Sequence, residues 1–170
     1  MRILIGGSEE AVSRVKEMLP RAAAEKVIGF FHAEMFAGNN EIFEKVKPVI
    51  EEFEREKEKA TVSELLTAAM KREHAVLGME DVLNALQEGR IMKLVFIKEF
   101  GDSGYACRKC RYLTERKVAP CPYCRGEMEE VSYIVDLAAQ RAVESGASVE
   151  VISDNKELLN TGGIGAFLRF

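Results

Sequence analysis

The sequence predicts an α/β protein, because short apolar runs suited to strands alternate with segments of helical periodicity. A helical segment separates the first two runs, so we expect their strands to pair in parallel. The same alternation in the second half of the chain predicts an α/β/α sandwich. The expected strands are residues 2–5, 26–31, 91–97, 148–152 and 164–170.

The first expected strand ends in Gly6-Gly7-Ser8, and a helix follows it. Ser8 is a typical N-cap, with Glu9 and Glu10 in the first turn where the helix dipole favours acids. Pro20 ends the helix. The glycines lack the lysine and the spacing of a phosphate-binding loop, so we interpret them as a plain strand–helix turn.

A strongly charged segment begins at Glu41, and residues 51–59 are almost all Glu, Lys and Arg. We expect a long exposed connecting helix with internal ion pairs, which Pro48 kinks. It follows only two strands, so residues 1–59 form a truncated α/β unit with this helix. Residues 60–170 are expected to form the second domain.

The second domain opens at Thr61 with a new helical face, and Leu77-Gly78 breaks the chain. Further helices are expected at residues 79–86, 131–144 and 154–160, and Gly89 and Gly146 end the first two of these.

All the cysteines of the chain lie between the third and fourth expected strands, as two Cys-x-x-Cys pairs ten residues apart. Each pair directs two thiolates at one ion from a tight turn, and a short hairpin brings the turns together. Four thiolates satisfy tetrahedral Zn²⁺ and leave no open position for a substrate. The sequence therefore predicts a structural zinc site in a hairpin inserted at about residues 104–131, with ligands Cys107, Cys110, Cys121 and Cys124.

Other uses of four cysteines are weaker here. Two disulfides need an oxidising compartment, and the sequence shows no secretory signal and no transmembrane run. A thioredoxin-like redox site uses one such pair at a helix start. An iron–sulfur cluster also takes four cysteines, so zinc and iron both stay open.

Basic residues gather on the expected hairpin although the net charge of the chain is −4. Only Glu115 opposes them locally. They form either a solvated surface or a contact for RNA or an acidic protein. The candidate contact residues are Arg108, Lys109, Arg111, Arg116 and Lys117.

His32 and Glu34 follow the second strand, at the edge where α/β sheets often carry chemistry. No nucleophile or open metal position accompanies them, so we expect no catalytic residue. We expect a cytoplasmic protein without membrane contact.

Several blocks of the second domain resemble archaeal and eukaryotic class-1 peptide-chain release factors. The stretch Leu77-Gly78-Met79-Glu80-Asp81-Val82 resembles the opening of their C-terminal domain, and the paired cysteines resemble the zinc ribbon of the archaeal members. Residues 146–153 and 162–170 are similar to their closing segments. Residues 3–7 and 26–29 resemble later strands of their middle domain, with the charged helix as the connector to the C-terminal domain.

The resemblance implies a domain similar to small ribosomal and kink-turn-binding proteins, which docks translational GTPases and the recycling ATPase at the ribosome. The family's hydrolysis is attributed to a Gly-Gly-Gln loop, whereas here Gly6-Gly7 precedes Ser8 and Gly162-Gly163 precedes Ile164. We therefore expect a termination-factor fragment that is not itself an enzyme. The alternatives are a free-standing RNA-binding module and a ribosome-rescue paralogue, although the rescue relatives resemble it without a zinc ribbon.

Overall fold

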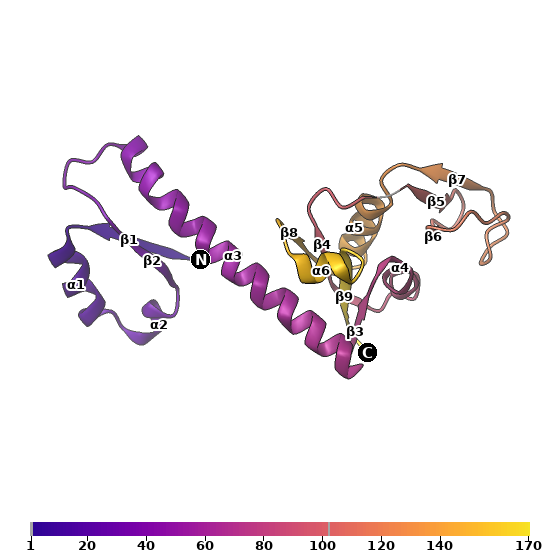
Figure 1. The fold of residues 1–170 in the computed structure, drawn as a ribbon, viewed down its shortest axis with the longest axis horizontal. Helices are drawn as coiled ribbons and strands as arrows, with labels where there is room; N and C mark the ends of the chain where they lie inside the picture. The colour runs from indigo at the N-terminus through magenta and orange to yellow at the C-terminus, as the bar shows by residue number, and fades with distance from the viewer. Residues whose placement is uncertain (1, 102) are drawn as a thin grey trace. The chain divides into compact units, whose positions relative to one another are not determined.

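The structure is a computed structural model that describes residues 2–101 and 103–170. It divides into two compact units, Met1–Glu58 and Lys59–Phe170, which are described separately below (Figure 1). Among the described residues, no helix combines the length and the apolar character needed to cross a membrane.

The first unit contains two parallel strands, β1 (Ile3–Gly7) and β2 (Val27–His32), joined through helices α1 (Glu9–Met18) and α2 (Arg21–Ala24). The Ser8 hydroxyl accepts a hydrogen bond of 3.3 Å from the backbone N–H of Ala11. The predicted parallel pairing and the predicted N-cap are both confirmed. The turn predicted at Gly6-Gly7 was wrong, because both glycines belong to β1 and pair with Phe31 and His32 of β2.

A single helix of 33 residues, α3 (Asn39–Lys71), replaces the two helical segments that the sequence analysis separated near residue 60. That separation was wrong. No glycine or proline lies between Glu51 and Lys71, and the Glu, Lys and Ala residues there are strong helix formers. What changes near Thr61 is burial: Val62 and Leu65 are fully buried, whereas residues 54–57 are exposed.

The second unit is built on a four-stranded sheet in the order β3-β9-β4-β8. Its strands are β3 (Ala75–Leu77), β4 (Ile91–Ile97), β8 (Ser148–Ile152) and β9 (Ile164–Leu168). β4 and β8 run parallel, whereas β9 is antiparallel to β3 and β4. β3 was not predicted, because an apolar run of three residues before Gly78 gives no periodic signal.

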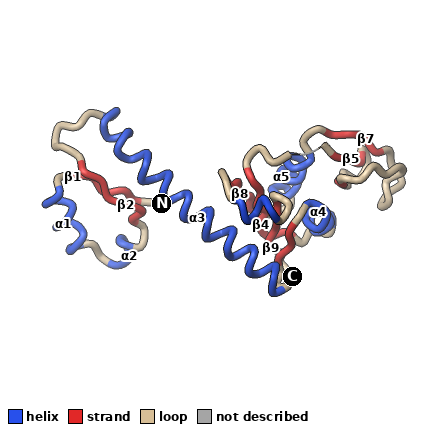
Figure 2. Tube along the Cα trace, in the orientation of Figure 1, coloured by secondary structure: helices blue, strands red, loops and turns tan. Residues whose placement is uncertain are grey.

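Both faces of this sheet are covered by helices, so the predicted α/β/α sandwich is confirmed (Figure 2). Helices α4 (Met79–Gln87) and α5 (Ile134–Glu144) pack on one face, against Leu94 and Ala166 among others. The last part of α3 and the short helix α6 (Lys156–Asn160) pack on the other face, against Val95 and Phe167. The helix predicted from Val131 begins three residues later, at Ile134, because Val131 ends a strand.

Contact between α3 and the sheet leaves no free volume at Gly165, in the middle of β9. A Cβ atom at this glycine would lie 2.8 Å from the Cδ2 atom of Leu65 and 2.9 Å from that of Leu77. These distances are far inside ordinary van der Waals contact, so α3 packs directly on the backbone of the central strand.

We expect Leu65→Ala to lower the free energy of unfolding of the second unit by about 2–5 kcal/mol, because it opens a cavity in a fully buried contact. Met70→Ala is the matched control, since the Met70 side chain lies on the same helix and is 77% exposed. It should change stability by less than about 0.5 kcal/mol. Urea unfolding, monitored through amide hydrogen exchange in β9, measures the change in stability of each variant. An equal loss of stability in the two variants would contradict the assigned packing of α3.

Candidate metal centre

The cysteines lie in a three-stranded antiparallel sheet inserted between β4 and α5. Its strands are β5 (Gly104–Cys107), β6 (Leu113–Thr114) and β7 (Met128–Val131), in the order β6-β5-β7. Ala106 and Leu113 of this insertion belong to the same core cluster as α4 and α5. Its base is therefore anchored by apolar packing, whereas its tip carries the cysteines.

The four cysteine sulfurs converge. All four Sγ atoms lie within 4.8 Å of one another, with 3.4 Å between Cys107 and Cys124 and 3.6 Å between Cys110 and Cys121. A disulfide bond is about 2.05 Å long, so these are free cysteines. The corners of a tetrahedron around zinc with Zn–S bonds of about 2.3 Å lie about 3.8 Å apart. The four residues thus fit one tetrahedral metal ion.

Each cysteine pair is held by the same backbone turn. The N–H of Arg111 donates to the carbonyl of Cys107, and the N–H of Arg125 to that of Cys121, both at 2.9 Å. Arg111 and Arg125 adopt left-handed conformations, with φ of 62° and 56°. We define these two turns, residues 107–111 and 121–125, as the first and second knuckles.

Gly126 leaves room for the sulfurs beside the second knuckle. A Cβ atom there would lie 3.1 Å from the sulfur of Cys107, 3.2 Å from that of Cys124 and 3.0 Å from the Cβ atom of Lys109. Gly126 was not among the predicted site residues. Its φ is not in the left-handed region, so limited space and not backbone conformation favours glycine at this position.

The thiols differ in their acidity. The backbone N–H of Cys110 donates to the Cys107 sulfur at 3.5 Å and lowers the pKa of Cys107 to about 6. Burial raises the pKa of the Cys110 thiol to about 12. Metal ions bind thiolates, so a bound cation would displace the protons from all four sulfurs.

The basic residues of the insertion are largely engaged in ion pairs. Arg108 pairs with Glu129 at 2.8 Å and Glu127 at 3.3 Å, and Arg111 pairs with Glu144 of α5 at 2.6 Å. Arg116 pairs with Glu80 of α4 at 2.6 Å. Lys109 and Lys117 are exposed. Of the five candidate contact residues, the three arginines thus form ion pairs within the chain, and the two lysines are exposed to solvent.

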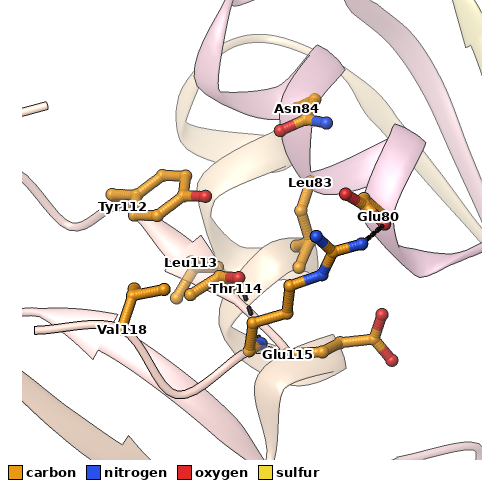
Figure 3. Close-up of a pocket in the computed structure, with 9 residues that line it drawn as sticks. Glu80, Leu83, Asn84, Tyr112, Leu113, Thr114, Glu115 and Val118 are labelled. Atoms are coloured by element: carbon orange, nitrogen blue, oxygen red, sulfur yellow. Dashed lines mark hydrogen bonds and ion pairs between the residues drawn. The ribbon is translucent and has the colours of Figure 1, made fainter. Parts of the chain in front are cut away.

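A cavity of about 190 Å³ lies between α4 and the insertion. Figure 3 shows Glu80, Leu83 and Asn84 of α4 across this cavity from Tyr112 and Thr114.

The ion pairs from Arg116 to α4 and from Arg111 to α5 join residues that lie 36 and 33 positions apart in the sequence. No spacing rule in the sequence could have found them.

His32 and Glu34 stay on the surface of the first unit. Their side chains are 60% and 77% exposed, and 3.5 Å separates His32 Nε2 from Glu34 Oε1. A solvated pair of this kind is common on protein surfaces.

We expect Cys121→Ser to lose the bound metal and to raise amide exchange throughout residues 104–131, because metal binding and local folding are one equilibrium. The sandwich should keep its protection, since its strands are held by two apolar clusters. Elemental analysis and hydrogen exchange measure both effects.

Tyr123→Phe is the matched control, in the same knuckle but without a change of sulfur ligand. Full metal stoichiometry with an unchanged insertion in Cys121→Ser would show that the ligand assignment is wrong.

A sequence model of the family eRF1 domain 3 matches residues 55–170. Two curated proteins named peptide chain release factor subunit 1 are each 30% identical to the chain. The protein of Methanocaldococcus jannaschii aligns over 159 positions, 78% of this chain and 38% of its own length. That of Archaeoglobus fulgidus aligns over 188 positions, 99% of this chain and 46% of its own length. The chain therefore spans less than half of either relative.

Solved structures share the fold. The C-terminal domain of a peptide chain release factor from Methanosarcina mazei superimposes with a TM-score of 0.53 at 20% identity, over 79% of this chain and 97% of that domain. Archaeoglobus fulgidus Pelota gives a TM-score of 0.55 at 21% identity, over 99% of this chain and 49% of Pelota.

The family match covers the sandwich and its cysteine-bearing insertion, and the curated relatives carry the release-factor name, as the sequence resemblance predicted. The chain belongs to the eRF1 domain 3 family.

Proposed function

We propose that this chain is part of an archaeal-type class-1 peptide chain release factor and supplies its docking domain at the ribosome. The observation that carries the proposal is the family match over residues 55–170. Both curated relatives are release factor subunits, and the longer alignment extends over 99% of the chain. The domain acts in translation termination.

The proposed partners are a translational GTPase and a recycling ATPase. Among proteins of the same fold, Saccharomyces cerevisiae Dom34 is described as interacting with Hbs1, at a TM-score of 0.58 and 14% identity. An archaeal Pelota is described as ribosome-bound with ABCE1, at a TM-score of 0.56 and 17% identity. We extend these two kinds of partner to the present chain.

The proposed domain organisation follows the same comparison. Residues 60–170 are the C-terminal domain, with the metal insertion at about 104–131, and residues 1–59 are the end of a middle domain with its connecting helix. Among the described residues of the first unit only Ala33 is buried, while Met35 and Phe36 are 89% and 93% exposed. A two-stranded sheet with so little buried surface supports a unit that is one part of a larger domain.

We assign Zn²⁺ to the four cysteines, because tetrahedral sites of four thiolates most often hold zinc and serve structure. Cys107, Cys110, Cys121 and Cys124 would be the ligands, and the ion would stiffen the insertion. An iron centre is the other candidate. Zinc gives a colourless protein, whereas iron bound to thiolates absorbs visible light, so an absorption spectrum with elemental analysis separates the two.

The proposed role is binding and not catalysis. The matched family is domain 3, and the glycine pairs at residues 6–7 and 162–163 precede Ser8 and Ile164 instead of glutamine. We assign peptide release to other parts of the release factor.

The alternative is an RNA-binding module that uses the basic insertion. Three of its five candidate residues, Arg108, Arg111 and Arg116, already pair with carboxylates of this chain. Phosphate contacts would have to replace these pairs. The existing ion pairs therefore favour a protein-docking domain over an RNA-binding module. The four cysteines favour a release factor over a ribosome-rescue paralogue.

A pull-down with the zinc-replete chain from archaeal extract, at moderate and high salt and with nuclease-treated extract as control, tests the proposal. We expect a translational GTPase or a recycling ATPase to be retained at high salt, through apolar and mixed contacts. Recovery of RNA alone, lost as salt rises because counterion release drives that binding, would overturn the docking function.

A further inference from the structure

One side chain of the sandwich holds the first knuckle of the metal insertion. Arg141 is half-buried on α5, and its guanidinium donates one hydrogen bond to the backbone carbonyl of Arg111. It donates a second, of 3.1 Å, to the side-chain carbonyl of Gln87 at the end of α4. Arg141 therefore connects both helices of one layer to the turn that presents Cys107 and Cys110.

Arg111 is held at the same place through its own side chain. Its guanidinium pairs with Glu144 at 2.6 Å, and Glu144 also accepts a hydrogen bond of 3.0 Å from Gln140. Arg141 and Glu144 are three residues apart and therefore neighbours on one face of α5. The backbone and the side chain of Arg111 are thus both fixed to this helix.

The carbonyl that Arg141 binds is positioned by the knuckle. Arg111 has a left-handed φ of 62°, and its N–H closes the turn on the carbonyl of Cys107. This conformation is costly for a residue with a side chain, and convergence of the cysteines on one ion would stabilise it.

Charges of both signs surround Arg141. In the described part of the chain, no Asp or Glu forms an ion pair with it, and Arg111 is a cationic neighbour. Burial and the charge of Arg111 lower the pKa of Arg141, whereas the Cys110 sulfur and the Glu144 carboxylate act in the opposite direction. Four thiolates around one divalent ion carry a net charge of about −2, which suits a nearby guanidinium.

We propose that Arg141 is the positioning residue through which the metal centre fixes the insertion on the sandwich. It binds the knuckle that the metal shapes, and its charge offsets that of the thiolates. The proposal rests on metal binding by the four cysteines, and it is independent of which partner docks. Ala106 and Leu113 hold the base of the insertion, and Arg141 sets the orientation of its tip.

The test compares Arg141→Met with Arg141→Lys in the full chain. We expect Arg141→Met to weaken zinc binding by about 10–100-fold, as loss of a residue supporting metal ligands does, in competition with a chelator. Amide exchange should rise in residues 104–131 and stay unchanged in β4 and β9. Arg141→Lys keeps the charge but not the two-pronged geometry, so it should recover only part of the zinc affinity.

Lys117→Met is the matched control. Lys117 is a basic residue of the same insertion, but it lies outside both knuckles and its side chain is exposed. Wild-type zinc affinity and amide exchange in Arg141→Met would overturn the proposal, and so would an equal loss in Lys117→Met, since any nearby positive charge would then suffice.

Two further measurements keep the outcomes separate. If Arg141→Met fails to fold, Gln87→Ala removes only one acceptor of Arg141 and should give a smaller loosening of the same residues 104–131; unchanged exchange there would overturn the proposal. Elemental analysis of the wild-type chain comes first, because a chain that takes up no metal would overturn the metal assignment and this inference together. The partner pull-down would stand unaffected.

Discussion

Burial of β9 between two layers of helices is the constraint on which the second unit depends. All five residues of this strand are buried, and it pairs with β3 on one side and β4 on the other. Ile164, Ala166 and Leu168 contribute to one apolar cluster, and Phe167 to the other. Alternation along one strand thus joins both faces of the sandwich, and the close approach of Leu65 at Gly165 shows how little free volume remains.

The inserted sheet is held by a different kind of interaction. Its strands are short, and only Ala106 and Leu113 reach the main core as buried residues. The rest of its attachment is polar: Arg116 reaches α4, Arg111 reaches α5, and Arg141 reaches back to the first knuckle. Such contacts are sensitive to geometry, so the precision of the tip depends on the cysteines that shape it.

The sequence predicted the parts of this molecule that depend on local pattern. β4 and β8 lie where their short strand-forming runs predicted them, and the spacing of the cysteines predicted a cluster that the structure assembles. It failed at α3, where a change of burial was interpreted as a break in the helix, and at β3, which is too short to show a period. It also missed Gln87, Arg141 and Glu144, because their roles come from contacts between residues far apart in the chain.

The space beside Gly126 ties the identity of one residue to three others. A Cβ atom at this position would lie within 3.2 Å of the sulfurs of Cys107 and Cys124 and of the Cβ atom of Lys109, so a larger residue would push these atoms apart. A larger residue at position 126 would therefore disturb the cysteine cluster, although the glycine itself offers no ligand atom. In a lineage that had lost the cysteines, this restriction would be lifted and larger residues could accumulate there. We therefore expect glycine at this position in relatives that keep the four cysteines.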